Sequence, residues 1–230
     1  MNLLQLAVKS FHQILTPAFR GILYRTILLT LALLISTGIG LRSLAGHFVE
    51  GYSPWIVTTV TLLTSLVFTF AAAYLIAPVS SIVAGFFLDD VAAKVEAADY
   101  PADPPGRALP FADAMWMSLR FALLIGLVNL AALALLLVPG VNAIAFFVAN
   151  AYLLGREYFE LAACRFRGLD GARDFRRANG PHIFVAGLII AALLAVPVLN
   201  LLTPLFGTVF MVHLHKQMSS EIGASLVSRT

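Results

Sequence analysis

Four long apolar stretches constrain this chain more than any other feature of its sequence. A membrane-spanning helix needs about 20 predominantly apolar residues, and a run of roughly 18 already indicates one. Hydrophobic residues make up 60% of the chain and charged residues only 12%, which is about half the charged fraction of a soluble globular domain. We therefore predict an all-α integral membrane protein. The apolar stretches cover about residues 26–41 (extended by Gly21–Tyr24), 55–88, 119–155 and 182–214.

The alternation of apolar and polar segments predicts one helical membrane domain over residues 1–218 and a mobile C-terminal tail over residues 219–230. Within the domain we expect an amphipathic helix, two spans and two hairpins. Their predicted ranges are, in that order, 1–16, 22–41, 55–88, 114–168 and 182–216.

The N-terminal segment has the periodicity of an amphipathic helix. Its apolar face carries Leu4, Val8, Phe11 and Leu15, which recur at helical spacing. Such a helix can lie at the membrane interface. A simple extension of the first span is an equally good interpretation.

The last two apolar stretches are each interrupted by the same motif, V-P-x-x-N. It places Pro139 and Asn142 in the first stretch, and Pro197 and Asn200 in the second. Proline breaks or kinks a helix. Each motif is therefore either a turn outside the membrane, which makes six spans, or the tip of a re-entrant hairpin. Both tips lack charge and the arms are short, so we favour two long spans plus two re-entrant hairpins. The asparagines would then hydrogen-bond the backbone groups left without helical partners at each tip.

The distribution of Lys and Arg predicts the orientation. The connection over residues 42–53 carries one Lys or Arg, whereas residues 156–181 carry six arginines. Cytoplasmic loops are enriched in Lys and Arg, so we expect both termini and both large polar segments on the cytoplasmic side of a multi-pass protein.

Several classes of function are disfavoured. The single cysteine, Cys164, excludes an intrachain disulfide, and His213 and His215 have no nearby third ligand for a metal. No nucleotide-binding or hydrolase motif occurs, and the basic-aromatic pattern of nucleic-acid binding is missing. We expect no enzyme activity, no cofactor, no metal and no nucleic-acid partner.

Four blocks in order, "TPAFR", "APVSSIVAGFF", "YLLGREYFELAACRFRG" and "VPVLNLLTPLFGTVFMVHLHK", resemble the CysZ family of bacterial inner-membrane sulfate permeases. The similarity runs from about residue 5 to residue 216. It implies two long transmembrane helices, two partly penetrating hairpins and a homo-oligomer. It also implies a bacterial inner-membrane protein that imports sulfate, or a related oxyanion, for cysteine biosynthesis.

The resemblance also implies an anion site at a P-G-[aliphatic]-R-R turn ahead of the first span. Here Arg20 matches the first arginine of that turn, and Gly21 stands where the second would be. The implied site comprises Arg20, the backbone of Phe19 and Gly21, and Arg25 as a substitute cation. A helix N-terminus favours anions independently of any family, although arginines at a lipid boundary can also serve topology alone.

Two alternatives stay open from the residues. Arg156 and Glu157 follow an apolar arm, so they are either gate residues of a pore or an interfacial charge pair. Since Gly21 departs from the family pattern, a non-transporting membrane scaffold or assembly factor with the same fold is the alternative function.

Overall fold

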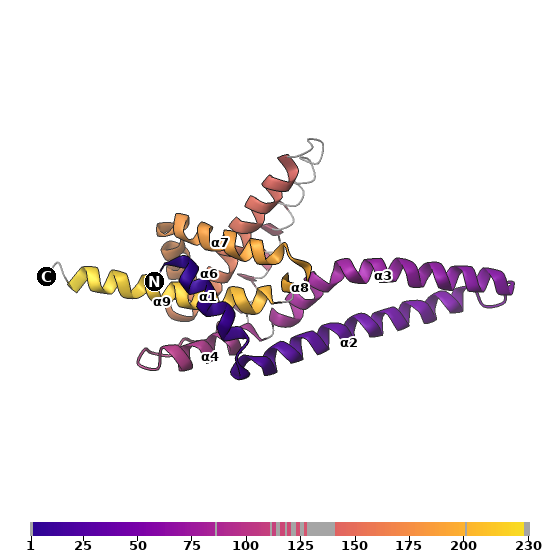
Figure 1. Ribbon diagram of the computed structural model, residues 1–230, viewed down its shortest axis with the longest axis horizontal. Coiled ribbons are helices and arrows are strands. Elements are labelled where there is room, and N and C mark those ends of the chain that lie inside the picture. Colours follow the sequence, from indigo (N-terminus) through magenta and orange to yellow (C-terminus); the bar gives the residue numbers. More distant parts are fainter. Residues whose placement is uncertain are drawn as a thin grey trace. The chain divides into compact units, whose positions relative to one another are not determined.

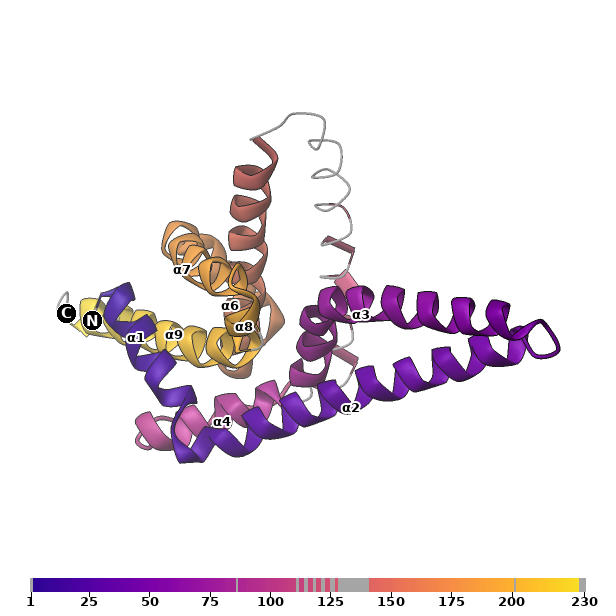
Figure 2. The same cartoon turned by 45° about the vertical axis from the view of Figure 1, so that its right-hand side comes forward.

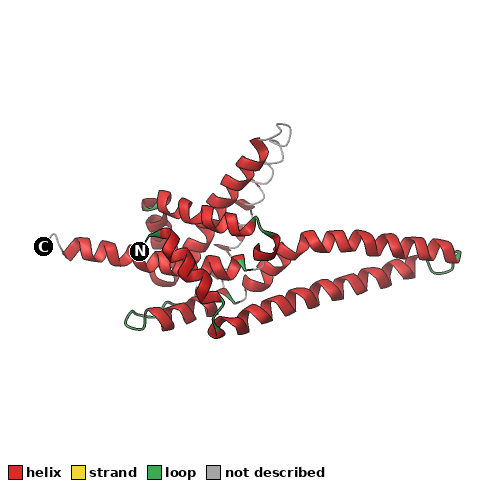
Figure 3. Cartoon of the chain, viewed as in Figure 1, coloured by secondary structure: helices red, strands yellow, loops and turns green. Residues whose placement is uncertain are grey.

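The computed structural model of the chain consists of helices and connecting loops in the part that it describes. The described helices are coloured along the chain in Figure 1, and no strand occurs among the described residues (Figure 3). The backbone is described for residues 2–85, 87–110, 112–113, 116–117, 119–120, 123–124, 127, 141–200 and 202–227. The helices are α1 (Leu3–Ile14), α2 (Pro17–Phe48), α3 (Pro54–Gly85), α4 (Leu88–Asp99), α6 (Val141–Ala178), α7 (Gly180–Leu194), α8 (Pro197–Asn200) and α9 (Thr203–Val227).

The chain forms two compact units. Residues 21–87 make up the first, here called the span pair, and residues 1–20 with 88–230 make up the second, here called the helical unit. The boundaries of the single domain expected from the sequence stay a prediction.

The span pair consists of α2 and α3, which run side by side and are joined by a short loop (Figures 1 and 2). Gly51 in that loop has φ +89°, a conformation that glycine adopts without strain. Gly38 allows close packing, because a Cβ at this position would lie 2.5 Å from Cε1 of Phe68. The two helices therefore meet where α2 has no side chain.

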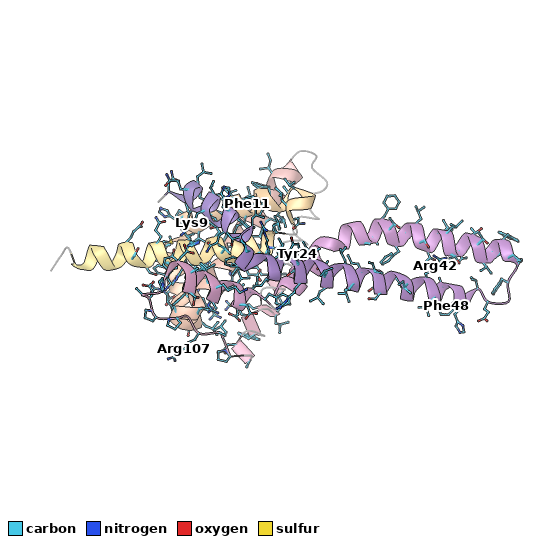
Figure 4. All side chains as sticks on the ribbon, turned by 60° about the horizontal axis from the view of Figure 1, so that its bottom comes forward. Lys9, Phe11, Tyr24, Arg42, Phe48 and Arg107 are labelled. Atoms are coloured by element: carbon cyan, nitrogen blue, oxygen red, sulfur yellow. The ribbon has the colours of Figure 1, made fainter. Side chains whose placement is uncertain are left out.

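Both helices of the span pair are long and apolar enough to cross a membrane. The qualifying segments are Pro17–Phe48 and Pro54–Ala72, and only 11% and 0% of their most apolar windows are buried. Large apolar side chains point outward along both helices, and Phe48 lies near the loop end of α2 (Figure 4). Such surfaces are stable only against lipid or another apolar partner. The two predicted transmembrane helices are confirmed.

A bent helix pair lies in the helical unit. The segment Phe147–Ala178 and helix α7 together meet the length and hydropathy of a span, but they are bent by 92° at their junction. They pack closely where Gly155 faces Gly187. A Cβ on Gly155 would lie 2.7 Å from the Ile183 carbonyl oxygen, and one on Gly187 would collide with the Ala151 carbonyl. The pair turns the chain back as a re-entrant element does.

The second predicted hairpin tip falls between α7 and α9. The short helix α8 begins at Pro197 and ends at Asn200, and the Oδ1 atom of Asn200 is buried without a hydrogen-bond partner among the described residues. For the first tip, Pro139 lies outside the described residues and Asn142 belongs to the first turn of α6.

Helix α9 is the centre of the helical unit. Every residue from Thr203 to Lys216 is buried, and α1, α4, α6 and α7 all pack against this helix. A helix that is apolar on all sides belongs in an interior. Its fully buried side chains include Leu205, Val209, Phe210, Met211, Val212 and His213.

Helix α1 packs one face against this core and exposes the other. Leu6, Ser10 and Ile14 are buried, whereas Leu4 and Val8 are 68% and 50% exposed. The exposed apolar face fits the interfacial position expected from the sequence.

Candidate functional site

The turn between α1 and α2, residues 15–20, is called the elbow. Both the amide N–H and the Oγ1 hydroxyl of Thr16 donate to the Gln13 carbonyl oxygen, at 3.0 and 2.7 Å. Pro17 then opens α2, at the position where a missing N–H costs nothing. The Thr16 carbonyl accepts the amide N–H groups of Phe19 and Arg20 at 3.0 and 3.1 Å. Local backbone bonds therefore shape the elbow.

Two cationic side chains donate to backbone carbonyls of the elbow. The Nε atom of Arg20 donates to the Leu15 carbonyl at 2.9 Å, and Nζ of Lys94 on α4 donates to the Ala18 carbonyl at 3.0 Å. Both side chains are exposed. The positive end of the α2 dipole lies at the same turn, so three sources of positive potential coincide there. The sequence alone does not predict Lys94, because it lies 76 residues from Ala18.

The other residues implied for the anion site have different surroundings. The Phe19 side chain is 2% exposed, and its amide is engaged by Thr16. No atom lies within 4 Å of a Cβ built on Gly21. Arg25 is exposed on α2. Gly21 and Arg25 belong to the span pair, whereas Arg20 and Lys94 belong to the helical unit.

A chain of buried and half-buried polar side chains connects α1, α4 and α9, and is called the polar chain. Its contacts, in order, are Lys9 Nζ to Asp99 Oδ1 at 2.6 Å, Gln13 Nε2 to Asp99 Oδ2 at 2.5 Å, Gln13 Oε1 to His213 Nε2 at 2.7 Å, and His213 Nδ1 to the Tyr100 hydroxyl at 2.7 Å. Lys9 lies on α1 (Figure 4). Three helices that are distant in sequence are thereby held together.

Charge and burial set the protonation of Asp99 and Tyr100, the members of the polar chain at the end of α4. Burial raises the pKa of the Asp99 carboxyl, but the hydrogen bonds from Lys9 and Gln13 outweigh it, so that the pKa lies below its ordinary value. Burial raises the pKa of Tyr100 to about 12, and the negative charges of Asp99 and Asp103 add to the effect. Asp99 is therefore an acceptor and Tyr100 a donor at neutral pH.

A buried ion pair joins α4 to α6. Arg165 donates from Nε to Glu96 Oε1 at 2.8 Å and from Nη1 to Asp89 Oδ1 at 2.6 Å. The side chains of Arg165 and Glu96 are each only 6% exposed. Glu96 also accepts the Gly106 amide at 2.9 Å, which fastens the loop after α4. Nothing in the sequence distinguishes Arg165 from the other arginines around it.

A family model described as sulfate transporter CysZ/etoposide-induced protein 2.4 matches residues 6–204. The chain belongs to this family. Membership confirms the resemblance and supports a transport role in a membrane. The match includes the elbow and both spans, so the cations found there lie within the part that defines the family. No curated protein matches the sequence.

The predicted gate residues of this CysZ-family chain are not paired with each other. Arg156 Nε lies 3.3 Å from Glu160 Oε1, and Arg176 Nε lies 2.6 Å from the same oxygen. Glu157 is half-buried beside this cluster. The structure thus makes Glu160, rather than Glu157, the carboxylate that joins two arginines.

His215 is buried among aromatic rings. Its ring stacks on Phe166 at a centroid distance of 5.1 Å, and Arg167 Nε donates to its Nε2 atom at 3.2 Å. The Nδ1 atom of His215 has no hydrogen-bond partner among the described residues. Within the same part of the chain, no three His, Cys, Asp or Glu side chains gather as a metal site would require.

Proposed function

We propose that this protein is an oxyanion permease that imports sulfate across the bacterial inner membrane for cysteine biosynthesis. The observation that carries the proposal is that Arg20 and Lys94 both donate to backbone carbonyls of the elbow, those of Leu15 and Ala18, in a chain of the CysZ family. A guanidinium fork matches the oxygens of a tetrahedral anion. Lys94 supplies the positive charge that the family pattern places at position 21.

The proposal assigns a path to the captured anion. It leaves the elbow and passes between the re-entrant hairpins, whose tips are Pro139–Asn142 and Pro197–Asn200. Arg156 and Glu157 lie past the apolar arm of α6 and act as a gate. The protein works as a homo-oligomer in the lipid bilayer, with both termini in the cytoplasm and without a cofactor.

Uptake of radiolabelled sulfate into proteoliposomes tests the transport step. The wild-type protein should exceed empty liposomes, and Arg20→Ala should lose most of the flux because the fork is removed. Lys94→Ala should lose less, since a point charge is removed without a fork. Arg42→Ala is the matched control, because Arg42 is exposed at the other end of α2 (Figure 4). Wild-type flux equal to that of empty liposomes would refute the permease.

The open space at Gly21 offers a gain-of-function test. Gly21→Arg restores the family pattern, and nothing lies within 4 Å of the new Cβ. One added charge-assisted hydrogen bond corresponds to roughly tenfold tighter sulfate binding. Isothermal titration calorimetry measures the change, with Gly46→Arg, which has equal space and lies beyond the predicted span, as the control.

A membrane scaffold or assembly factor is the second candidate function. Two observations favour it: glycine at position 21, and the engagement of the Phe19 and Arg20 amides by the Thr16 carbonyl. A scaffold should give no heat with sulfate in the wild type or in Gly21→Arg. Saturable binding in both proteins would exclude it.

A further inference from the structure

His213 is a fully buried histidine whose two ring nitrogens are both occupied. It lies on α9 with 0% of its surface exposed. Nε2 is 2.7 Å from Gln13 Oε1, 200 residues away in sequence, and Nδ1 is 2.7 Å from the Tyr100 hydroxyl. Buried polar groups need partners, and here both partners come from other helices or their ends. The ring therefore joins α9 to α1 and to the end of α4.

The hydrogen bonds around His213 run in one direction. Gln13 uses its amide nitrogen to donate to Asp99, which leaves its oxygen as the acceptor for an N–H on His213 Nε2. Nδ1 of the neutral ring is then the acceptor for the Tyr100 hydroxyl. Donation passes from Tyr100 to His213, from His213 to Gln13, and from Gln13 to Asp99. Bonds aligned in this way polarise and strengthen one another.

The same glutamine also holds the elbow through its backbone. The Gln13 carbonyl accepts both the N–H and the hydroxyl of Thr16. The Thr16 carbonyl in turn accepts the Arg20 amide at 3.1 Å. Gln13 is therefore linked to Arg20 through two consecutive backbone acceptors.

Helix α4 fixes the elbow at a second point. Asp99 binds Gln13 and Lys9 near the C-terminal end of α4, and Lys94, one and a half turns earlier, binds the Ala18 carbonyl. The polar chain thus holds the C-terminal end of α4 to α1 and α9, alongside the Arg165–Glu96 pair that joins α4 to α6, and α4 carries Lys94. Both cations of the site are therefore linked to the polar chain.

We propose that His213 and Gln13 are positioning residues for the oxyanion site: their hydrogen bond anchors the elbow to α9 and so holds the carbonyls to which Arg20 and Lys94 donate. The proposal rests on the proposed function, because it explains how that same site is held. Neither side chain contacts the anion. Their loss should move the cations apart without removing a charge.

Two variants break the anchor, and one conserves it. Gln13→Leu and His213→Leu remove the hydrogen bond, whereas His213→Gln keeps one acceptor for Tyr100 and one donor for Gln13. Gln13 is only half-buried, so Gln13→Leu tests the anchor even where His213→Leu fails to fold. His12→Leu is the matched control, because His12 is exposed at the neighbouring position of α1.

Two measurements on the full-length protein in detergent separate anchoring from binding. The first is hydrogen exchange of the bonded elbow amides, those of Thr16, Phe19 and Arg20, without sulfate. The second is the sulfate dissociation constant from calorimetry. We expect Gln13→Leu and His213→Leu to exchange faster at the elbow and to bind sulfate roughly five- to tenfold more weakly, the loss of one net hydrogen bond. His213→Gln and His12→Leu should retain wild-type values of both.

Each of the other possible outcomes contradicts one part of the proposal. Wild-type exchange in both leucine variants refutes the anchor, whatever sulfate does. Faster exchange with unchanged sulfate affinity refutes the positioning role. If the wild type binds no sulfate, the proposed function fails, while the exchange data still decide whether His213 holds the elbow.

Discussion

The span pair and the helical unit differ in where their bonded polar side chains find partners. Bonds between side chains of different helices occur in the helical unit. The bonded hydroxyls of α2 and α3 stay within their own helix, and those of Thr26 and Thr30 on α2 are buried with no partner among the described residues. In the span pair, hydroxyls turn back to the carbonyl four residues earlier on the same helix: Thr37 to Leu33, Thr58 to Pro54, Thr61 to Val57, Ser65 to Thr61 and Thr69 to Ser65. In the helical unit, polar side chains bond across helices, as in the polar chain and the Arg165–Glu96 pair. Lipid offers no hydrogen bonds, so a lipid-facing helix must satisfy its polar groups locally.

The two units also differ in whether their apolar helices are buried within the protein. The most apolar windows of α2 and α3 are 11% and 0% buried, whereas α9 is buried throughout Thr203–Lys216. The span pair therefore depends on the bilayer for its stability, and the helical unit depends on its own tertiary contacts. Substitutions should be costly in the second unit and tolerated at matched positions in the first.

The largest expected effect follows from removing the buried arginine. Arg165→Met leaves Glu96 buried without its cation, which costs about 3–5 kcal/mol of unfolding free energy. Thermal unfolding in detergent, followed by circular dichroism, measures the loss. Arg42→Met is the control in the span pair, because Arg42 is exposed. Equal melting temperatures for the two variants would remove the distinction between the units.

The second effect concerns the glycine contact of α6 and α7. Gly187→Leu drives a side chain into the Ala151 carbonyl, and overpacking of this kind costs about 3 kcal/mol. Size-exclusion chromatography and melting in detergent report the damage. Gly40→Leu, where nothing lies within 4 Å of the Cβ, should leave both unchanged, and a comparable loss there would contradict free tolerance in the span pair.

The smallest effect is the ionisation of Asp99. Its pKa is lowered in the fold by Lys9 and Gln13, so its carboxylate stabilises the fold above its ordinary pKa of 3.8, and this contribution is lost as the pH falls through and below that value. Asp99→Asn should cost about 1 kcal/mol at pH 7. The melting temperatures of wild type and variant should converge toward pH 3. Asp170→Asn, with its side chain 93% exposed, should follow the wild type at all pH values.

Patterns within single segments predicted much of the fold. The length and hydropathy of residues 22–41 and 55–88 predicted the two spans, because lipid burial requires only a continuous apolar helix. Pro197 and Asn200 predicted a break that the structure shows between α7 and α9. The bend of α6 against α7 was not predicted; it brings Gly155 close to Gly187, two residues far apart in sequence.

The candidate site could be predicted only in part. Arg20 was implied by the resemblance to the family turn ahead of the first span, and its place at a helix start supported it. Lys94 and Glu160 were missed, because a lysine in a polar helix and a glutamate in a basic segment resemble solvated residues. Their roles depend on which helix lies opposite each of them.

The sequence by itself determined the helical class, the two spans and the membership of the CysZ family, because hydropathy and short motifs act within contiguous segments. Only the tertiary structure decided which charged side chains are buried and which carboxylates pair with more than one arginine. Gln13 and His213 meet across 200 residues, and Lys94 meets Ala18 across 76. Such pairs form only after α1, α4 and α9 have packed, since long-range contacts follow from the burial of whole helices rather than from any local pattern.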